Sequence, residues 1–149
     1  MAHFEKSIDI AVPPEQVWAY IVQGTTTPVY MPMVTDFAFT REVRYEPGDR
    51  FKMKLKVRGV EMPIEYEVTE EVVPQRLTFT SIAGMRNTTT WELTPIASGT
   101  RVTFRSDYEM PGSFVGAIVD RLVVENAMKA GVSEALENLK RILETGQAA

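Results

Sequence analysis

The sequence predicts an α+β fold in which a curved antiparallel sheet closes around one long C-terminal helix. Nearly everything between Asp36 and Met110 shows the alternation of apolar and polar residues that is typical of half-buried strands. The chain then ends in a helical pattern from Ser113 to Glu144. The first half of that pattern is apolar on most of its circumference, so we expect the sheet to wrap it and to leave a cavity beside it.

Length and composition limit the classes of function. The 149 residues suit a single domain, 1–149, with one core. The net charge of −4 argues against nucleic acid as a partner, because phosphate binding needs a clustered basic surface. With no cysteine and one histidine, His3, the chain has no means for thiol catalysis, a zinc–thiolate site or a Ser-His-Asp triad. No Asp/Glu spacing resembles a calcium loop, so we expect no metal and no cofactor.

The sequence also lacks targeting signals. Its first residues do not have the charged and then apolar pattern of a signal peptide. No apolar run approaches the ~20 residues that a membrane span needs. We therefore expect a cytoplasmic protein without a membrane span, as a monomer or a homodimer.

The first elements are a strand, a helix and a connector. Phe4–Val12 alternates with period two, as a half-buried strand does. Pro13-Pro14-Glu15 opens a helix, since proline suits the first turn and an acid suits the positive end of the helix dipole. Gly24 is predicted to end this helix. The connector Thr25–Val34 is rich in threonine and proline and has room for a short helical turn at most.

Six further strands follow, separated by turn residues. In Arg50–Arg58, apolar residues alternate with basic ones, and the next strand carries a row of glutamates. Opposite charges on the outer faces of the two strands should fix their register, on what is otherwise an ordinary solvated surface. The strands are predicted over Asp36–Tyr45, Arg50–Arg58, Met62–Val68, 75–81 after Pro74, Arg86–Thr94 and Val102–Tyr108.

Several segments match, in order, the pieces of one known family. They are IDIAVPPEQVWAYI, PVYMPMV, YEPGDRF, VTEEVVPQRLTFTSIAG, WELTPIASGTRVTF, MPGSF and ALENLKRILE. Together they resemble the helix-grip fold of the START / birch-pollen-allergen (SRPBCC) superfamily, in its polyketide cyclase/dehydrase-like branch. The resemblance implies a seven-stranded sheet that grips the last helix over a cavity. Members bind or transport lipids, sterols and other apolar molecules, cyclise or dehydrate polyketides, or act on protein partners.

The phases of the strands also identify side chains that should face the helix and contact a ligand. The same residues would equally suit an ordinary core that they fill themselves. The candidates from the strands are Phe39, Arg41, Met53, Leu55, Ile64, Tyr66, Phe79, Asn87, Trp91, Phe104 and Tyr108. The connector adds Tyr30, and the closing helix adds Phe114, Ile118 and Leu122.

Four polar residues are candidates for chemistry. The forked donors of Arg41 suit a ligand carboxylate or enolate, although an arginine near a strand end can also reach water. Tyr66 and Tyr108 could orient a ligand or donate a proton to an oxyanion, or could be buried tyrosines with satisfied hydroxyls. Glu125 could be a desolvated base or could pair with a basic residue at helical spacing. Further polar residues on the inward phase are Lys6, Ser81, Asn87, Thr89 and Ser106.

Three functions remain open from the sequence. The first is binding or transport of a small apolar ligand, such as a lipid, an isoprenoid or an aromatic, polyketide-like metabolite. The second is a polyketide cyclase or dehydratase, for which the resemblance is the only support, because no pair of groups has a spacing that demands catalysis. The third is a protein-interaction or co-chaperone module, for which the connector Thr25–Val34 could supply an apolar patch.

Overall fold

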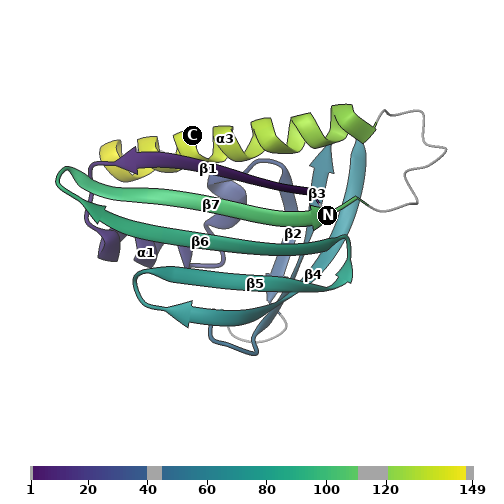
Figure 1. Ribbon diagram of the computed structural model, residues 1–149, viewed down its shortest axis with the longest axis horizontal. Helices are drawn as coiled ribbons and strands as arrows, with labels where there is room; N and C mark the ends of the chain where they lie inside the picture. The colour runs from purple at the N-terminus through teal and green to yellow at the C-terminus, as the bar shows by residue number, and fades with distance from the viewer. Residues whose placement is uncertain (1, 40–44, 111–120, 147–149) are drawn as a thin grey trace.

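The protein is a single curved sheet with helices on its concave side (Figure 1). The computed structural model describes residues 2–39, 45–110 and 121–146. The strands are β1 (Ala2–Ile10), β2 (Val34–Phe39), β3 (Arg50–Val57), β4 (Val60–Val72), β5 (Arg76–Gly84), β6 (Arg86–Ile96) and β7 (Gly99–Glu109). The helices are α1 (Pro14–Ile21), α2 (Thr27–Tyr30) and α3 (Arg121–Thr145).

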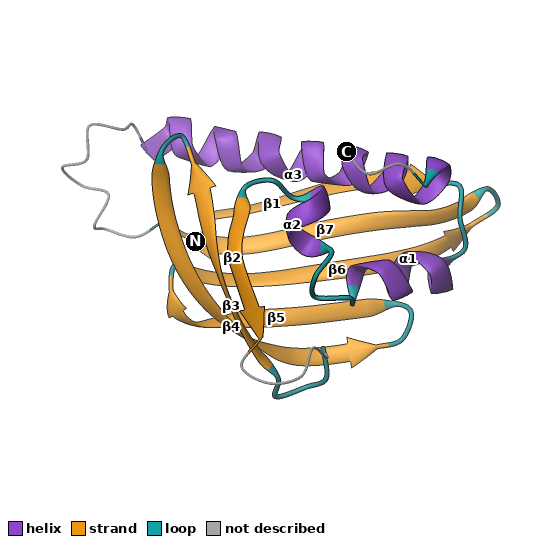
Figure 2. Ribbon diagram, turned by 180° about the vertical axis from the view of Figure 1, so that it is seen from behind, coloured by secondary structure: helices purple, strands orange, loops and turns teal. Residues whose placement is uncertain are grey.

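All seven strands are antiparallel to their neighbours, in the order β1-β7-β6-β5-β4-β3-β2. The sheet curls, and α3 runs alongside β1 across its opening, while α1 and α2 lie inside the curve (Figure 2). This arrangement confirms the predicted α+β class and the helix-grip architecture. It also confirms the helix and the short helical connector that were expected after the first strand.

The β3–β4 hairpin has the register that its charges predict. Lys52 lies opposite Glu65, and Lys56 lies opposite Glu61. Arg50 Nε donates to Glu67 Oε1 at 3.1 Å. Because side chains alternate between the two faces of a strand, this charged row on the outer face leaves the apolar residues of β3 and β4 to line the concave face.

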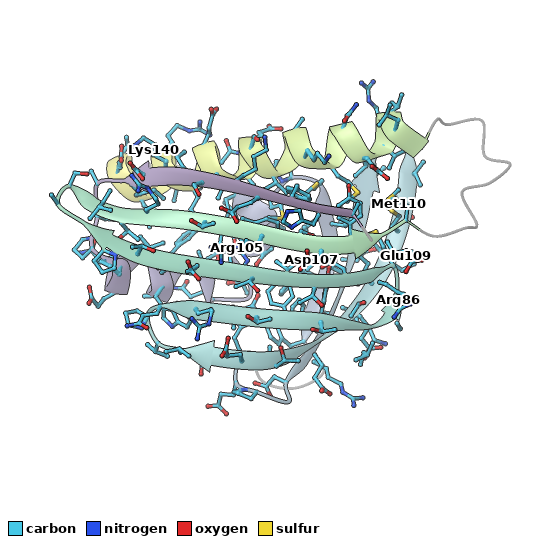
Figure 3. All side chains as sticks on the ribbon, in the orientation of Figure 1. Arg86, Arg105, Asp107, Glu109, Met110 and Lys140 are labelled. Atoms are coloured by element: carbon cyan, nitrogen blue, oxygen red, sulfur yellow. The ribbon has the colours of Figure 1, made fainter. Side chains whose placement is uncertain are left out.

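An alternating row of charges crosses five strands on the outer face. It runs from Glu70 on β4 through Arg76, Glu92 and Arg105 to Glu5 on β1. Arg76 Nε lies 2.7 Å from Glu70 Oε1, and Arg105 binds both Glu92 at 3.0 Å and Glu5 at 2.7 Å (Figure 3 labels Arg105). Exposed pairs contribute at most about 1 kcal/mol each, so their main effect is on strand register.

The position of α3 corrects one expectation. Its covered stripe consists of Val124, Met128, Val132, Ala135, Leu136 and Leu139, all buried. Leu122 is 61% exposed and Val123 is 41% exposed. The prediction that the sheet wraps this part of the helix on all sides is therefore wrong for the described residues. The helix crosses the open side of the sheet, so only one of its faces is covered. The predicted helix start at Ser113 lies outside the described residues.

The connector between α1 and β2 is fixed from two sides. Asn138 of α3, itself buried, donates from Nδ2 to the backbone oxygen of Tyr30 at 3.1 Å. On the other side, the backbone N–H of Lys56 donates to the backbone oxygen of Met33 at 2.7 Å. These bonds hold α2 and the residues after it between α3 and β3, where they form one wall of the interior.

Candidate functional site

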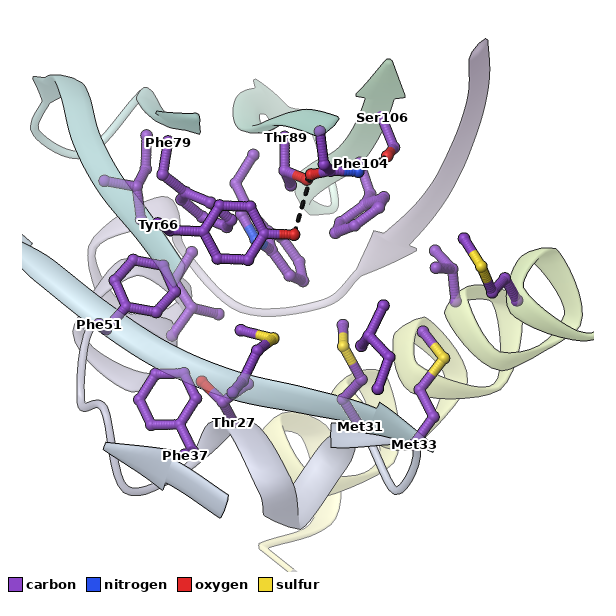
Figure 4. Close-up of a pocket in the computed structure, with 18 of the residues that line it drawn as sticks. Thr27, Met31, Met33, Phe37, Phe51, Tyr66, Phe79, Thr89, Phe104 and Ser106 are labelled. Carbon is purple, nitrogen blue, oxygen red and sulfur yellow. Dashed lines mark hydrogen bonds between the residues drawn. The ribbon is translucent and has the colours of Figure 1, made fainter. Parts of the chain in front are cut away.

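A cavity of about 60 Å³ lies between the concave face of the sheet, α2 and α3 (Figure 4). Side chains from all seven strands and from the three helices reach it. Aromatic rings and methionines dominate its lining. The aromatic residues are Phe4, Tyr30, Phe37, Tyr45, Phe51, Tyr66, Phe79, Trp91 and Phe104, and the methionines are Met31, Met33, Met53, Met85 and Met128. The other lining residues are Ile21, Thr27, Leu55, Leu77, Asn87, Thr89, Ser106 and Val132.

The aromatic residues support one another. The rings of Phe51 and Tyr66 are stacked with centroids 5.2 Å apart, and Phe79 meets Tyr66 edge-on at 4.9 Å. Trp91 and Phe104 form another edge-on pair at 5.0 Å. Such pairs are rigid, whereas methionine has three rotatable bonds and adapts its shape. The parts of the lining that can change shape are therefore the methionine side chains. Two of them, Met31 and Met33, follow α2 in the chain.

Four polar side chains form a connected group in the cavity wall, called here the polar cluster: Tyr66, Asn87, Thr89 and Ser106. All four are buried. The hydroxyls of Tyr66 and Thr89 both donate to Asn87 Oδ1, at 3.0 and 2.6 Å. Asn87 Nδ2 donates to Ser106 Oγ at 2.8 Å. Figure 4 shows the Tyr66 hydroxyl pointing along its bond into this group. Strands β4, β6 and β7 thus bring these four polar side chains together at one part of a largely apolar cavity wall.

Tyrosines elsewhere in the lining are also deeply buried. Burial raises the pKa of Tyr30 and Tyr45, and a hydrogen bond with Thr27 lowers both pKa values by a smaller amount. Burial likewise raises the pKa of Tyr66, opposed by a smaller effect of Thr89. All three phenols therefore stay neutral in the folded protein at a pH at which an exposed tyrosine ionises.

The buried tyrosines predict a loss of stability at alkaline pH. Their folded pKa values lie above the value of 10.0 for an exposed tyrosine, so the stability they support is complete below about pH 10. It is lost as the pH rises toward the folded values, because only the unfolded chain ionises. We expect the urea midpoint to fall as the pH rises above about 10, and to fall less steeply in Tyr66→Phe, which cannot ionise. Equal slopes in the two proteins would contradict a buried neutral Tyr66.

Eight of the residues proposed from sequence as ligand contacts line the cavity. They are Tyr30, Met53, Leu55, Tyr66, Phe79, Asn87, Trp91 and Phe104. Three others do not line the cavity. Ile64 and Tyr108 are buried away from it, and the ring of Tyr108 lies edge-on to that of Phe4 with centroids 5.9 Å apart. Phe39 is half-buried and packs on Phe51. Leu122 is exposed, for the reason given for α3.

The remaining candidates divide into two groups. Arg41, Phe114 and Ile118 lie outside the described residues. Glu125 is only partly buried and is not among the residues that line the cavity, and Lys6 of the edge strand β1 is exposed. Within the described residues, no three His, Asp or Glu side chains come together in a way that could hold a metal ion. No helix in the same ranges is long and apolar enough to cross a membrane.

Sequence reasoning missed several lining residues outside the regular strands. Met31, Met33 and Thr27 come from the connector, and Met85 comes from the bend between β5 and β6. The alternation of apolar and polar residues along a strand shows which side chains face inward. A connector has no such periodic pattern, so its inward-facing residues cannot be predicted in this way. The only available signal was composition, since PVYMPMV is unusually rich in large apolar residues for a loop.

A curved seven-stranded sheet that grips a C-terminal helix over an apolar cavity defines a helix-grip protein of the START / birch-pollen-allergen type. The chain belongs to the family described as polyketide cyclase / dehydrase and lipid transport, whose model matches residues 1–144. No curated protein sequence matches it.

Solved structures are similar over nearly their whole length. TTHA0849 from Thermus thermophilus has 22% identity and a TM-score of 0.80, with 98% of this chain and 99% of that chain covered. DR_A0006 from Deinococcus radiodurans has 18% identity and a TM-score of 0.72, with coverage of 99% and 100%. Ara h 8.0201 has 13% identity and a TM-score of 0.69, with coverage of 97% and 98%. At these identities the likeness shows the fold alone.

Proposed function

We propose that the protein binds, and transports or stores, a small apolar ligand in the cavity between the sheet and α3. The observation that carries the proposal is the lining: nine aromatic residues and five methionines surround a space that lies inside the molecule. Apolar walls with a few polar groups are typical of small-molecule sites. The family description, which includes lipid transport, agrees with this class of ligand.

The ligand must displace side chains to fit. The free space of about 60 Å³ is well below the roughly 300–1,000 Å³ of typical ligand pockets. The five methionines are the residues best able to give way, because an unbranched thioether changes rotamer at little cost. Met31 and Met33 directly follow α2, so movement of these two side chains would enlarge the cavity beside α3.

Turnover of a polyketide, the other activity in the family description, has less support in the cavity. Among the described lining residues there is no carboxylate, imidazole or amine that could abstract a proton. Of the catalytic candidates that the structure describes, only Tyr66 reaches the cavity, and its hydroxyl already donates to Asn87. Binding is therefore the function that the geometry supports best.

A cavity-filling variant tests the proposal. The neutral fluorescent probe N-phenyl-1-naphthylamine should bind the wild-type protein in a one-to-one complex. Val132→Phe places a ring in the cavity from α3, and we expect the affinity to fall at least about tenfold, because a free space of about 60 Å³ leaves little room for both rings. Val123→Phe, the same change at a 41% exposed position of the same helix, is the matched control and should leave the affinity unchanged.

Two outcomes would contradict the proposal: no binding of the probe to the wild-type protein, or equal binding by Val132→Phe and wild type. Circular dichroism of both variants checks that they are folded. Native mass spectrometry of the purified protein would in addition give the mass of any ligand that it retains.

A further inference from the structure

The polar cluster has more hydrogen-bonding capacity than its own members use. Both lone pairs of Asn87 Oδ1 are occupied, by the hydroxyls of Tyr66 and Thr89. Of the two N–H groups on Asn87 Nδ2, one donates to Ser106 Oγ. Within the described residues the second N–H and the hydroxyl hydrogen of Ser106 have no acceptor. The oxygens of Tyr66 and Thr89, which donate their hydrogens to Asn87, keep lone pairs as acceptors.

Strand pairing alone does not require this cluster. The backbones of β6 and β7 are paired without interruption from Arg86↔Glu109 to Ile96↔Gly99, so their register does not depend on the Asn87–Ser106 bond. One neighbouring contact does have a structural role. The β5–β6 pairing ends at Thr80↔Thr88, and beyond it the hydroxyl of Ser81 accepts from the backbone N–H of Asn87 at 2.9 Å. The other side-chain bonds meet at the cavity wall, where partly satisfied polar groups are costly unless a partner arrives.

In the part of the chain that the structure describes, no charged side chain lines the cavity and could pair with an ionised ligand group. The described lining contains no Asp, Glu, Lys, Arg or His. An ionised ligand group placed there would be buried without an ion partner, which is strongly unfavourable. A neutral oxygen avoids this cost, and it can accept from the free donors of Asn87 and Ser106 or donate to the oxygens of Tyr66 and Thr89.

We propose that the polar cluster recognises one neutral oxygen group, a hydroxyl or a carbonyl, on an otherwise apolar ligand. It thereby sets the ligand's orientation in the cavity and discriminates against the hydrocarbon and the carboxylate of the same skeleton. Rotatable hydroxyls on three of its four members let the cluster serve as donor or acceptor. This inference rests on the proposed function, and it narrows the ligand class from apolar molecules to neutral, singly oxygenated ones at this end of the cavity.

Three probes with one ring system test the inference: naphthalene, 2-naphthol and 2-naphthoate, titrated at pH 7.5 by fluorescence. We expect 2-naphthol to bind at least about tenfold more tightly than the other two, since a hydrogen bond that completes a buried polar group has that order of effect. Ser106→Ala and Thr89→Val remove hydroxyls from the cluster. In both variants the preference for 2-naphthol over naphthalene should shrink, while naphthalene binds as before.

The matched control for Thr89→Val is Thr103→Val. Thr103 is also a buried strand threonine, but its hydroxyl bonds to Ser7 at 3.0 Å and does not line the cavity. This variant should keep the full preference for 2-naphthol. Circular dichroism and the urea midpoint separate loss of binding from loss of folding.

Three other outcomes would contradict the inference. Equal affinity for naphthalene and 2-naphthol would leave the proposed function standing and reduce the cluster to a structural role. Tighter binding of 2-naphthoate would overturn the neutral class of ligand, and its loss in Arg41→Gln would identify Arg41 as the counter-ion. If none of the three probes binds, this inference fails, and the titration with N-phenyl-1-naphthylamine decides whether the proposed function fails with it.

Discussion

Replacing Gly99 with alanine is expected to lower the free energy of unfolding by about 3 kcal/mol or more. Gly99 begins β7 with φ = +146°, a conformation that residues with a side chain rarely adopt and that costs them roughly 1–3 kcal/mol. A Cβ at this position would also overlap the backbone oxygen of Ile10 and lie 2.8 Å from the backbone nitrogen of Val12. Backbone atoms of a neighbouring strand cannot rotate away as a flexible side chain can.

The close approach of Gly99 to the backbone of Ile10 and Val12 has a structural role. Ile10, the last residue of β1, pairs with Thr100, and the hydroxyl of Thr100 donates to the backbone oxygen of Val12 at 2.8 Å. The chain that leaves β1 thus passes directly over the start of β7 before it enters α1. Because α1 contributes Ile21 to the cavity, a shift at Gly99 should disturb both the sheet edge and one wall of the candidate site.

Gly48→Ala is the matched control for Gly99→Ala. Gly48 also has a positive φ, +94°, but an added Cβ there would meet no atom within 4 Å. Its replacement should therefore cost only the backbone strain, about 1–2 kcal/mol. Urea unfolding followed by far-ultraviolet circular dichroism measures both values. Equal losses in the two variants would show that the contact with β1 contributes nothing.

The sequence predicts which face of each strand is buried, because alternation is a local property. Met53, Tyr66 and Trp91 were placed on the inward face by period two alone, and all three line the cavity. The same alternation does not tell how far along a strand the cavity extends. Ile64 and Tyr108 share the inward faces of β4 and β7, yet each lies beyond the cavity and packs within the core.

For the helix, the local pattern does not tell which face is buried. Leu122 and Val123 are as apolar as Val124, but only Val124 is covered. Helical periodicity shows which residues share a face, and the neighbouring elements decide which faces are buried. The hydrogen bonds of the polar cluster were equally beyond reach, because they join β4, β6 and β7 through a curvature of the sheet that no single segment encodes.

Leu139→Ala tests which face of α3 the sheet covers. Leu139 is fully buried, and the change should lower the free energy of unfolding by about 3 kcal/mol, as the loss of a core leucine leaves an unfilled space. For a chain of this size that corresponds to a fall in Tm of roughly 6–12 °C. Leu139 does not line the cavity, so the folded variant should still bind N-phenyl-1-naphthylamine with the affinity of the wild-type protein.

Leu122→Ala makes the same chemical change in the same helix, where the side chain is 61% exposed. Leucine and alanine have similar helix propensities, so the free energy of unfolding should change by no more than about 0.5 kcal/mol. A loss at Leu122 as large as the loss at Leu139 would mean that the face of α3 that carries Leu122 is covered as well. The expected contrast between the two leucines would instead show that the sheet covers one face of α3, the face that carries Val124 and Leu139. Met128 and Val132 lie on that same covered face and line the cavity.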